Sequence, residues 1–443
     1  MLKLFLWLRY LRKRRVVLLS IAAVGLSCAL LIAVASLFNG FINVFERSTV
    51  EAIGDIVLAP QKRIENYQEL IRQLEELNPV EAATGTLTAQ GLLHLGKGNV
   101  RAVEIWGIDL QKEGRVTSFE RSLLKKEENE IQQPPATDSP QIKGYVGIGV
   151  LAEPNEQTDE YDINAVGQMA GQQLVLTTGS AAAGQNGSQQ FRRKTISFTV
   201  ENVVFTGVYF LDSRIVYLPI ERLQEALYPD SKQPLAGQIH IKLRKGADIE
   251  SAMAQIRGVW KVFADTKLGW DEYDIAGTRI ETARQMQSRF LAEVRKQMGV
   301  LLLIFGVVSL SSVLLVFCIF YMIVETRRKD VAIMKSCGAS SASVAIVFVG
   351  FGAFVGTLGT AIGTLLGYVI TKNINTVEGW IRLAFGLKLW KSSIYMFSKI
   401  PSEVDWHAVV WIVLSAVAGA AIGAAVPAIS AAITRPVNVL RYE

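Results

Sequence analysis

The sequence GVLLLIFGVVSLSSVLLVFCIFYMIV, residues 299–324, is a run of 26 residues without a single Asp, Glu, Lys or Arg. A bilayer core about 30 Å thick is crossed by about 20 helical residues, so this run is long enough to span a membrane. Three further uncharged runs, each at least 23 residues long, occur at 16–38, 344–370 and 408–433. Buried helices of soluble proteins rarely stay uncharged for so long. The sequence therefore predicts an α-helical integral membrane protein with four transmembrane helices.

The composition of the 443-residue chain fits this prediction, since half of the residues are apolar and only 19% are charged. An ordinary soluble domain has nearer a quarter of its residues charged. The net charge of +6 is divided unevenly: residues 46–295 hold 28 basic and 34 acidic residues, a net of −6, and the remainder carries +12. Nucleic-acid binding is the competing interpretation of such a basic chain, but its basic residues flank the predicted spans and form no patch on a soluble domain.

Positive charge near the ends of spans marks the cytoplasmic side of a membrane protein. Basic residues are concentrated before residue 16, in the loop 325–343 and in the tail 434–443. We therefore expect both termini and the short loop inside, and the large region 46–295 and the loop 371–407 outside. The loop 371–407 is itself slightly basic, which weakens the rule locally.

Residues 1–15 mix basic groups with Leu, Phe, Trp7 and Tyr10, which predicts a short helix in the membrane interface. A cleaved signal peptide is the alternative, because Ala33-Val34-Ala35 resembles a cleavage site. We favour a retained span, because the apolar run is long for a signal and a helical pattern continues beyond it.

Two amphipathic patterns adjoin the first two spans. Apolar residues recur at helical spacing over 39–54, after the first span, and over 271–298, before the second. We interpret them as stalk helices that carry the outer domain, because neither shows a helix breaker at the membrane. Two separate surface helices are the alternative.

The outer region 55–270 reads as an α+β domain. Its predicted strands are 55–59, 80–95, 100–108, 144–150, 172–178, 194–209, 214–218 and 238–243, and its predicted helices lie near 67–77 and 248–257. A turn, Gly96-Lys97-Gly98-Asn99, joins the second and third strands. We expect solvated loops at 120–142 and 179–190.

Small residues repeat along the predicted spans at intervals of three or four. In lipid, helices associate where small side chains allow the backbones to touch, so these residues predict packing seams. The seam residues are Gly25 and Ala29 in the first span, Gly359, Gly363 and Gly367 in the third, and Gly419 and Gly423 in the fourth.

The chain lacks the motifs that would make it an enzyme. It contains no P-loop, no G-x-S-x-G and no cluster with zinc-ligand spacing, and His94, His240 and His407 are isolated in sequence. The spans contain no ionisable residue that would serve an ion-coupled transporter. Cys28, Cys318 and Cys337 all lie outside the outer domain, so no disulfide framework is expected there. We predict no catalytic residue, no metal and no cofactor bound by this chain.

The segment that follows the second span, ETRRKDVAIMKSCGAS at residues 325–340, reads as a short helix closed by Gly338, with Ser340 as the cap of the third span. It resembles the cytoplasmic coupling helix of FtsX-like ABC transporter permeases. The resemblance assigns the ATPase contact to this segment; its candidate residues are Glu325, Arg327, Arg328, Asp330, Val331, Ile333, Met334, Lys335 and Gly338. Val331 and Met334, one helical turn apart, form the preferred apolar contact. An ordinary basic loop between spans is the alternative.

Other motifs carry the same resemblance over the whole chain. They are Asn39-Gly40-Phe41, Pro427-Ala428, Arg435-Pro436-Val437 and 440–443 for the permease, and Gly107-Ile108-Asp109, Gly149-Val150-Leu151-Ala152 and Leu174-Val175-Leu176 for a MacB-like periplasmic core. Tyr395, Ile400-Pro401 and Val404 look like the lipoprotein-releasing (LolC/LolE-type) branch. Leu110 and the long polar stretch 153–165 depart from the family pattern.

The resemblance implies a permease of the bacterial inner membrane. Its partners would be cytoplasmic ABC ATPase subunits that bind ATP and Mg, a second permease chain in a homo- or heterodimer, membrane lipid, and a lipoprotein substrate passed to a periplasmic carrier. Two alternatives stay open. One is a MacB-type efflux permease working with a periplasmic adaptor; the other is an FtsX-type regulator of cell-wall hydrolases.

Overall fold

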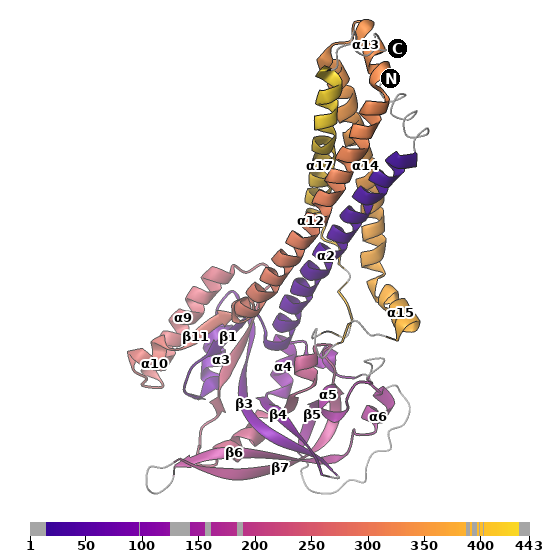
Figure 1. Cartoon of the computed structure of the whole chain (residues 1–443). Helices are drawn as coiled ribbons and strands as arrows, with labels where there is room; N and C mark the ends of the chain where they lie inside the picture. The colour runs from indigo at the N-terminus through magenta and orange to yellow at the C-terminus, as the bar shows by residue number, and fades with distance from the viewer. Residues whose placement is uncertain are drawn as a thin grey trace. The chain divides into compact units, whose positions relative to one another are not determined.

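The computed structural model describes residues 15–96, 98–124, 142–155, 161–183, 189–386, 390, 391, 397, 399–401 and 403–433. The chain divides into two compact units (Figure 1). The first unit comprises Met1–Asn43, Phe290–Trp380 and Ile400–Glu443, and the second comprises Val44–Arg289 and Ile381–Lys399. The predicted interfacial helix 1–15, except Arg15, and the tail 434–443 lie outside the described residues.

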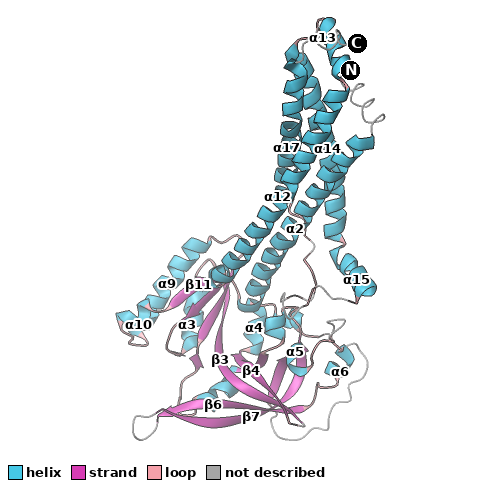
Figure 2. Ribbon diagram, in the orientation of Figure 1, coloured by secondary structure: helices cyan, strands magenta, loops and turns pink. Residues whose placement is uncertain are grey.

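Long helices dominate the first unit (Figure 2). These are α2 (Arg15–Ile53), α12 (Ser288–Thr326), α14 (Ser341–Lys372) and α17 (Trp406–Ile433), with the short α13 (Arg328–Ser336) between α12 and α14. By length and composition, the four long helices can cross a membrane, and they contain the four uncharged runs of the sequence. The predicted loop 371–407 contains a further helix, α15 (Ile374–Phe385).

The two predicted stalk helices have different outcomes. The helix of the first span continues without interruption to Ile53 and ends at Gly54, whose φ of +80° only glycine adopts without strain. The predicted helix over 271–298 is wrong in its first part, because residues 272–276 form the separate helix α10 (Glu272–Ala276) and β11 (Arg279–Thr282) pairs with β1. Pairing with Leu58 buries Ile280, so sheet formation overrides the helical spacing.

A nine-stranded sheet forms the second unit, in the order β11-β1-β10-β3-β4-β8-β5-β7-β6. Its other strands are β1 (Ile56–Ala59), β3 (Val80–Gly96), β4 (Asn99–Ile108), β5 (Lys143–Gly147), β6 (Gln173–Ala183), β7 (Gln189–Val204), β8 (Ile215–Pro219) and β10 (Gln238–Leu243). The 17-residue strand β3 pairs with β10 through its first half and with β6 through its second half. Because β6 returns to β3, six strands close into a ring. The short strands β2 (Ile64–Glu65) and β9 (Leu235–Ala236) pair separately.

Amphipathic helices cover the core of this sheet. The helix α3 (Tyr67–Glu75) buries Tyr67, Leu70, Ile71 and Leu74 at helical spacing, and α9 (Ile249–Thr266) buries its apolar side, including Trp260 and Phe263. A third helix, α8 (Ile220–Leu227), buries Ile220, Leu223 and Leu227. The remaining short helices are α4 (Leu110–Val116), η1 (Phe119–Ser122), α5 (Ile148–Leu151), α6 (Ile163–Gly167), α7 (Tyr209–Asp212) and α11 (Ala283–Met286).

The two predicted outer loops are only partly loops. The prediction for 179–190 is wrong at both ends, because Gly179 pairs with Arg193 and Ala183 with Gln189 in the β6–β7 hairpin. Cross-strand hydrogen bonds stabilise this polar stretch although its composition favours a loop. In the other stretch, residues 119–122 form η1, Leu123 bridges to Val204, and residues 125–141 lie outside the described part of the chain.

One carboxyl group of the second unit is buried in an unusual way. Glu113 of α4 is only 2% exposed, and its Oε2 has no hydrogen-bond partner among the described residues. Burial raises the pKa of Glu113 to about 8. The side chain lines a cavity of about 40 Å³ together with Ser48, Glu51 and Tyr217. A carboxyl group in this setting stays protonated at neutral pH, because ionisation would leave a charge without solvent.

This burial predicts a pH-dependent stability. The folded-state pKa of about 8 exceeds the ordinary 4.5, so the stabilising effect of the neutral carboxyl is complete below pH 4.5 and is lost as the pH rises through 8. Between pH 5 and pH 9 we expect the free energy of unfolding to decrease by at most about 4 kcal/mol. The melting temperature of the detergent-solubilised chain, followed by tryptophan fluorescence, should fall accordingly. Glu113→Gln should reduce this fall, and Glu120→Gln, at an exposed position, should not. Equal pH profiles for the three proteins would contradict the prediction.

Candidate functional site

The segment between α12 and α14 folds as the sequence predicts. Arg327 lies between Thr326, the last residue of α12, and the nine-residue helix α13. After α13, Gly338 takes a φ of +94°, and the Ala339 N–H donates to the Met334 carbonyl at 3.1 Å, which closes the helix. Ser340 then caps α14, since its Oγ accepts a hydrogen bond from the Ser343 N–H at 3.1 Å. The short helix, its glycine end and the serine cap are therefore confirmed.

The two faces of α13 are occupied differently from the prediction. Val331 is only 1% exposed and Met334 is partly buried, and both contact a cluster of buried side chains from the long helices, including Ile323 and Val324. Ile333 is 53% exposed. The prediction that Val331 and Met334 face outward as the apolar contact is therefore wrong. The outward face consists of Ile333 with Lys329, Ser336 and Cys337, all exposed.

The charged residues of the segment hold α13 against its neighbours. The Lys335 ammonium donates to the Ala432 carbonyl near the end of α17 at 2.7 Å. Arg327 forms an ion pair with Asp330 at 2.7 Å, within the segment itself. Glu325 is exposed, and the Arg328 side chain lies outside the described part of the structure. The packing of Val331 in the cluster of buried side chains and the bond from Lys335 to α17 together hold α13 against the long helices.

The predicted seam residues of α14 lie against α2. A Cβ atom on Gly363 would lie 2.5 Å from the Gly25 carbonyl oxygen, and one on Gly25 would lie 3.1 Å from the Gly359 oxygen. A Cβ on Gly367 would lie 3.2 Å from the Ala29 oxygen. The two backbones therefore touch along this seam, and no larger residue fits at Gly363 without movement.

A second seam joins α17 to α12, and a polar contact joins α12 to α2. A Cβ on Gly423 would lie 2.9 Å from the Val313 carbonyl oxygen, and one on Gly419 would meet the Val313 side chain at 3.1 Å. The hydroxyls of Ser27 and Ser312 form a buried hydrogen bond of 2.6 Å. All seven predicted seam residues thus lie on the helical bundle side of their helices, within the first unit.

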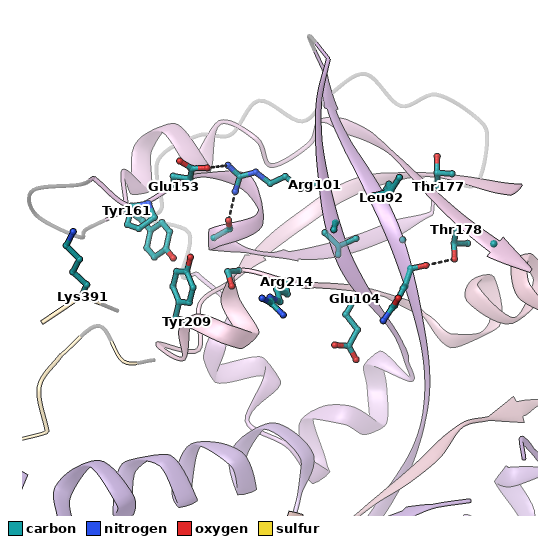
Figure 3. A pocket seen from close by; sticks show the side chains of 18 of the residues that line it. Leu92, Arg101, Glu104, Glu153, Tyr161, Thr177, Thr178, Tyr209, Arg214 and Lys391 are labelled. Carbon is teal, nitrogen blue, oxygen red and sulfur yellow. Dashed lines mark hydrogen bonds and ion pairs between the residues drawn. The ribbon is translucent and has the colours of Figure 1, made fainter. Parts of the chain in front are cut away.

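The second unit contains an open cavity of about 1190 Å³, shown in Figure 3. Arg101 lines it: the guanidinium donates to the Gly149 carbonyl at 2.7 Å and forms an ion pair with Glu153 at 3.1 Å. Tyr209 and Lys391 line one side of the cavity in this view, and Thr178, which donates to the Gln90 carbonyl at 2.8 Å, lines the other.

The cavity opens beside the part of β4 that does not pair with β8. Strand β8 starts to pair with β4 only at Glu104, opposite Ile215, whereas β4 continues to Asn99. Residues 99–103 therefore pair on one side only, with β3. The residues that line the cavity come from separate segments and form no motif, so the sequence did not predict it. Among the described residues, no group of three His, Cys, Asp or Glu side chains could hold a metal ion.

Comparisons with known proteins match the whole chain. The family described as FtsX-like permease C-terminal matches residues 302–436, and the MacB-like periplasmic core domain family matches residues 17–259, over half of the chain. The lipoprotein-releasing system transmembrane protein LolC of Neisseria meningitidis serogroup B is 26% identical over 100% of this chain and 99% of its own length. The LolE protein of the same system in Haemophilus influenzae is 23% identical, over 95% and 93%. The solved structure of the periplasmic region of MacB from Actinobacillus actinomycetemcomitans gives a TM-score of 0.32 at 12% identity, covering 54% of this chain and 95% of that one.

The seam between α2 and α14 generates a prediction. Gly363→Val should destabilise the chain by about 1–3 kcal/mol, because the new side chain must displace the α2 backbone. Gly306→Val is the matched control, since a Cβ at Gly306, also in a long helix, meets no atom within 4 Å. The measurement is thermal unfolding of both variants in the same detergent. A loss no greater for Gly363→Val than for Gly306→Val would show that the seam does not limit packing.

Proposed function

Because this chain belongs to the family of FtsX-like permeases with a MacB-like periplasmic core domain, we propose that it is the permease subunit of a lipoprotein-releasing ABC transporter. In this proposal, separate ATPase subunits hydrolyse ATP, and the permease extracts lipoproteins from the outer leaflet of the inner membrane toward a periplasmic carrier. The observation that carries the proposal is similarity along nearly the full length of two proteins named for lipoprotein release.

The outward face of α13 is the proposed contact with the ATPase. Ile333 is an exposed apolar side chain on a helix whose other side is buried, and Lys329 lies one turn away on the same face. A groove on the ATPase that receives Ile333 would remove it from water, which contributes about 1.5–3 kcal/mol. Because Val331 and Lys335 tie α13 to the long helices, a displacement of α13 would move them as well.

The proposed division of labour leaves the chemistry to the partner. The sequence contains no P-loop, so ATP and Mg are assigned to the ATPase subunits and no cofactor to this chain. A second permease chain, identical or different, completes the transporter in this proposal. The second unit would face the periplasm, where the open cavity at Arg101 offers a surface of mixed charge and aromatic groups to a substrate or carrier.

The contact of α13 with the ATPase is tested by Ile333→Glu. A carboxylate in an apolar groove would be desolvated without a partner, so recruitment of the cognate ABC ATPase should weaken about tenfold or more. Ile333→Leu, which keeps an apolar side chain of the same volume, should recruit normally. The measurement is co-purification of the co-expressed ATPase, with a melting curve as the folding control. Met334→Glu is unsuitable, because this side chain packs against the long helices. Normal recruitment by a folded Ile333→Glu variant would exclude α13 as the contact.

The topology is tested with thiol labelling in intact spheroplasts, in a Cys318→Ser background. Tyr273 is highly exposed in the second unit, so Tyr273→Cys should react with a membrane-impermeant maleimide. The native Cys337, exposed on α13, serves as the internal control and should react only after lysis. The opposite pattern would place the second unit in the cytoplasm and contradict the proposal.

A further inference from the structure

The helix α15 presents large apolar side chains to its surroundings. Trp380 is 67% exposed and Leu383 is 83% exposed, and their separation of three residues places them on the same face. The opposite side of the helix carries Glu378 and Arg382, which are partly buried. This 12-residue helix is amphipathic; Trp380 and Leu383 are exposed on one side of it, and Phe385 at its last position is exposed on the side of Glu378.

The start of α15 is fixed by a helix that is long and apolar enough to span the membrane. Only Asn373 separates Lys372, the last residue of α14, from Ile374, the first residue of α15. At this end of α14, the Tyr368 ring lies 6.1 Å from that of Trp406, the first residue of α17. Tyr and Trp gather where the hydrocarbon core meets the headgroups, so this ring pair marks the membrane surface. The helix α15 therefore begins six residues after Tyr368, within two helical turns of that surface.

The neighbouring faces of α14 and α17 are also apolar and exposed. Leu365 and Val369 on α14, and Trp411 on α17, are large apolar side chains that are exposed, as lipid-facing residues are. At the end of α14 that carries Tyr368, the chain continues into α15 and adds the exposed Trp380 to the apolar residues of the first unit. The exposed Lys372 ammonium lies 5.7 Å from the centre of the Tyr368 ring, where a cation is placed to meet lipid phosphate.

We propose that α15 lies in the membrane interface, with Trp380 and Leu383 inserted among the lipid acyl chains and Glu378 and Arg382 directed away from them. The occupant of the exposed face is lipid and not a second protein chain. The inference rests on one part of the proposed function, namely that α14 and α17 span the membrane. It requires neither the ATPase nor a particular substrate.

The test uses the full chain in nanodiscs of phosphatidylethanolamine and phosphatidylglycerol. Cys318 and Cys337 are replaced by Ser, and Cys28 remains because it is buried. An NBD fluorophore is then attached to Leu383→Cys, to the matched control Arg382→Cys, or to the reference Trp411→Cys. Quenching is measured separately with doxyl lipid labelled near the headgroup and with aqueous iodide.

The proposal expects NBD at position 383 to show a blue-shifted emission, to lose intensity with doxyl lipid and to be protected from iodide, as at position 411. At position 382, doxyl lipid should quench less and iodide more. Quenching of position 383 by iodide alone would overturn the proposal, and protection from both quenchers would do the same by showing that protein covers this face. Failure of lipid quenching at position 411 as well would instead contradict the membrane spans on which the proposed function depends.

Discussion

Close contact between helix backbones is the constraint on which the first unit depends. Inside a bilayer, the surrounding lipid is as apolar as the helices, so burial of Leu or Ile does not hold helices together. Van der Waals contact and buried hydrogen bonds must do so. The approach of Gly25 to Gly363, the contact of Gly423 with Val313 and the Ser27–Ser312 hydrogen bond supply these interactions along three helix pairs. Glycine lowers helix propensity, but at Gly25, Gly363 and Gly423 a Cβ would force the backbones apart.

The same packing explains how a nine-residue helix holds a defined orientation. Isolated helices of this length are unstable in water, because the few hydrogen bonds of a short helix do not offset the unfavourable free energy of nucleation. For α13, burial of Val331 and the bond from Lys335 to the Ala432 carbonyl supply the missing stabilisation. These contacts also fix which face points outward. Ile333 is exposed because Val331 and Lys335 turn the other side of the helix toward the long helices.

The sequence predicts correctly those elements that are determined by residues close together in the chain. The uncharged runs, the pairing of β3 with β4 from Gly96 and Asn99, the glycine end of α13 and the Ser340 cap each depend on residues within one continuous segment, and the corresponding elements form. The errors occur where distant residues decide. Ile280 pairs with Leu58, more than two hundred residues away, and forms a strand in place of a helix. Helical spacing correctly predicts that Val331 and Met334 share one side of α13, but it does not define which side of the helix the rest of the chain covers. The cavity at Arg101 depends on where β8 stops pairing with β4, which no single segment encodes.

The length of α2 connects these local arrangements to the proposed mechanism. This helix runs unbroken from Arg15 to Ile53, with residues up to Asn43 in the first unit and those from Val44 in the second. It contains no proline or internal break at which bending would concentrate. Residues of α2 in the first unit pack backbone to backbone on α14, and its last turns contribute Ser48 and Glu51 to the cavity beside the buried Glu113. In the proposed mechanism, α2 matters because it is one uninterrupted helix whose residues belong first to the first unit and then to the second.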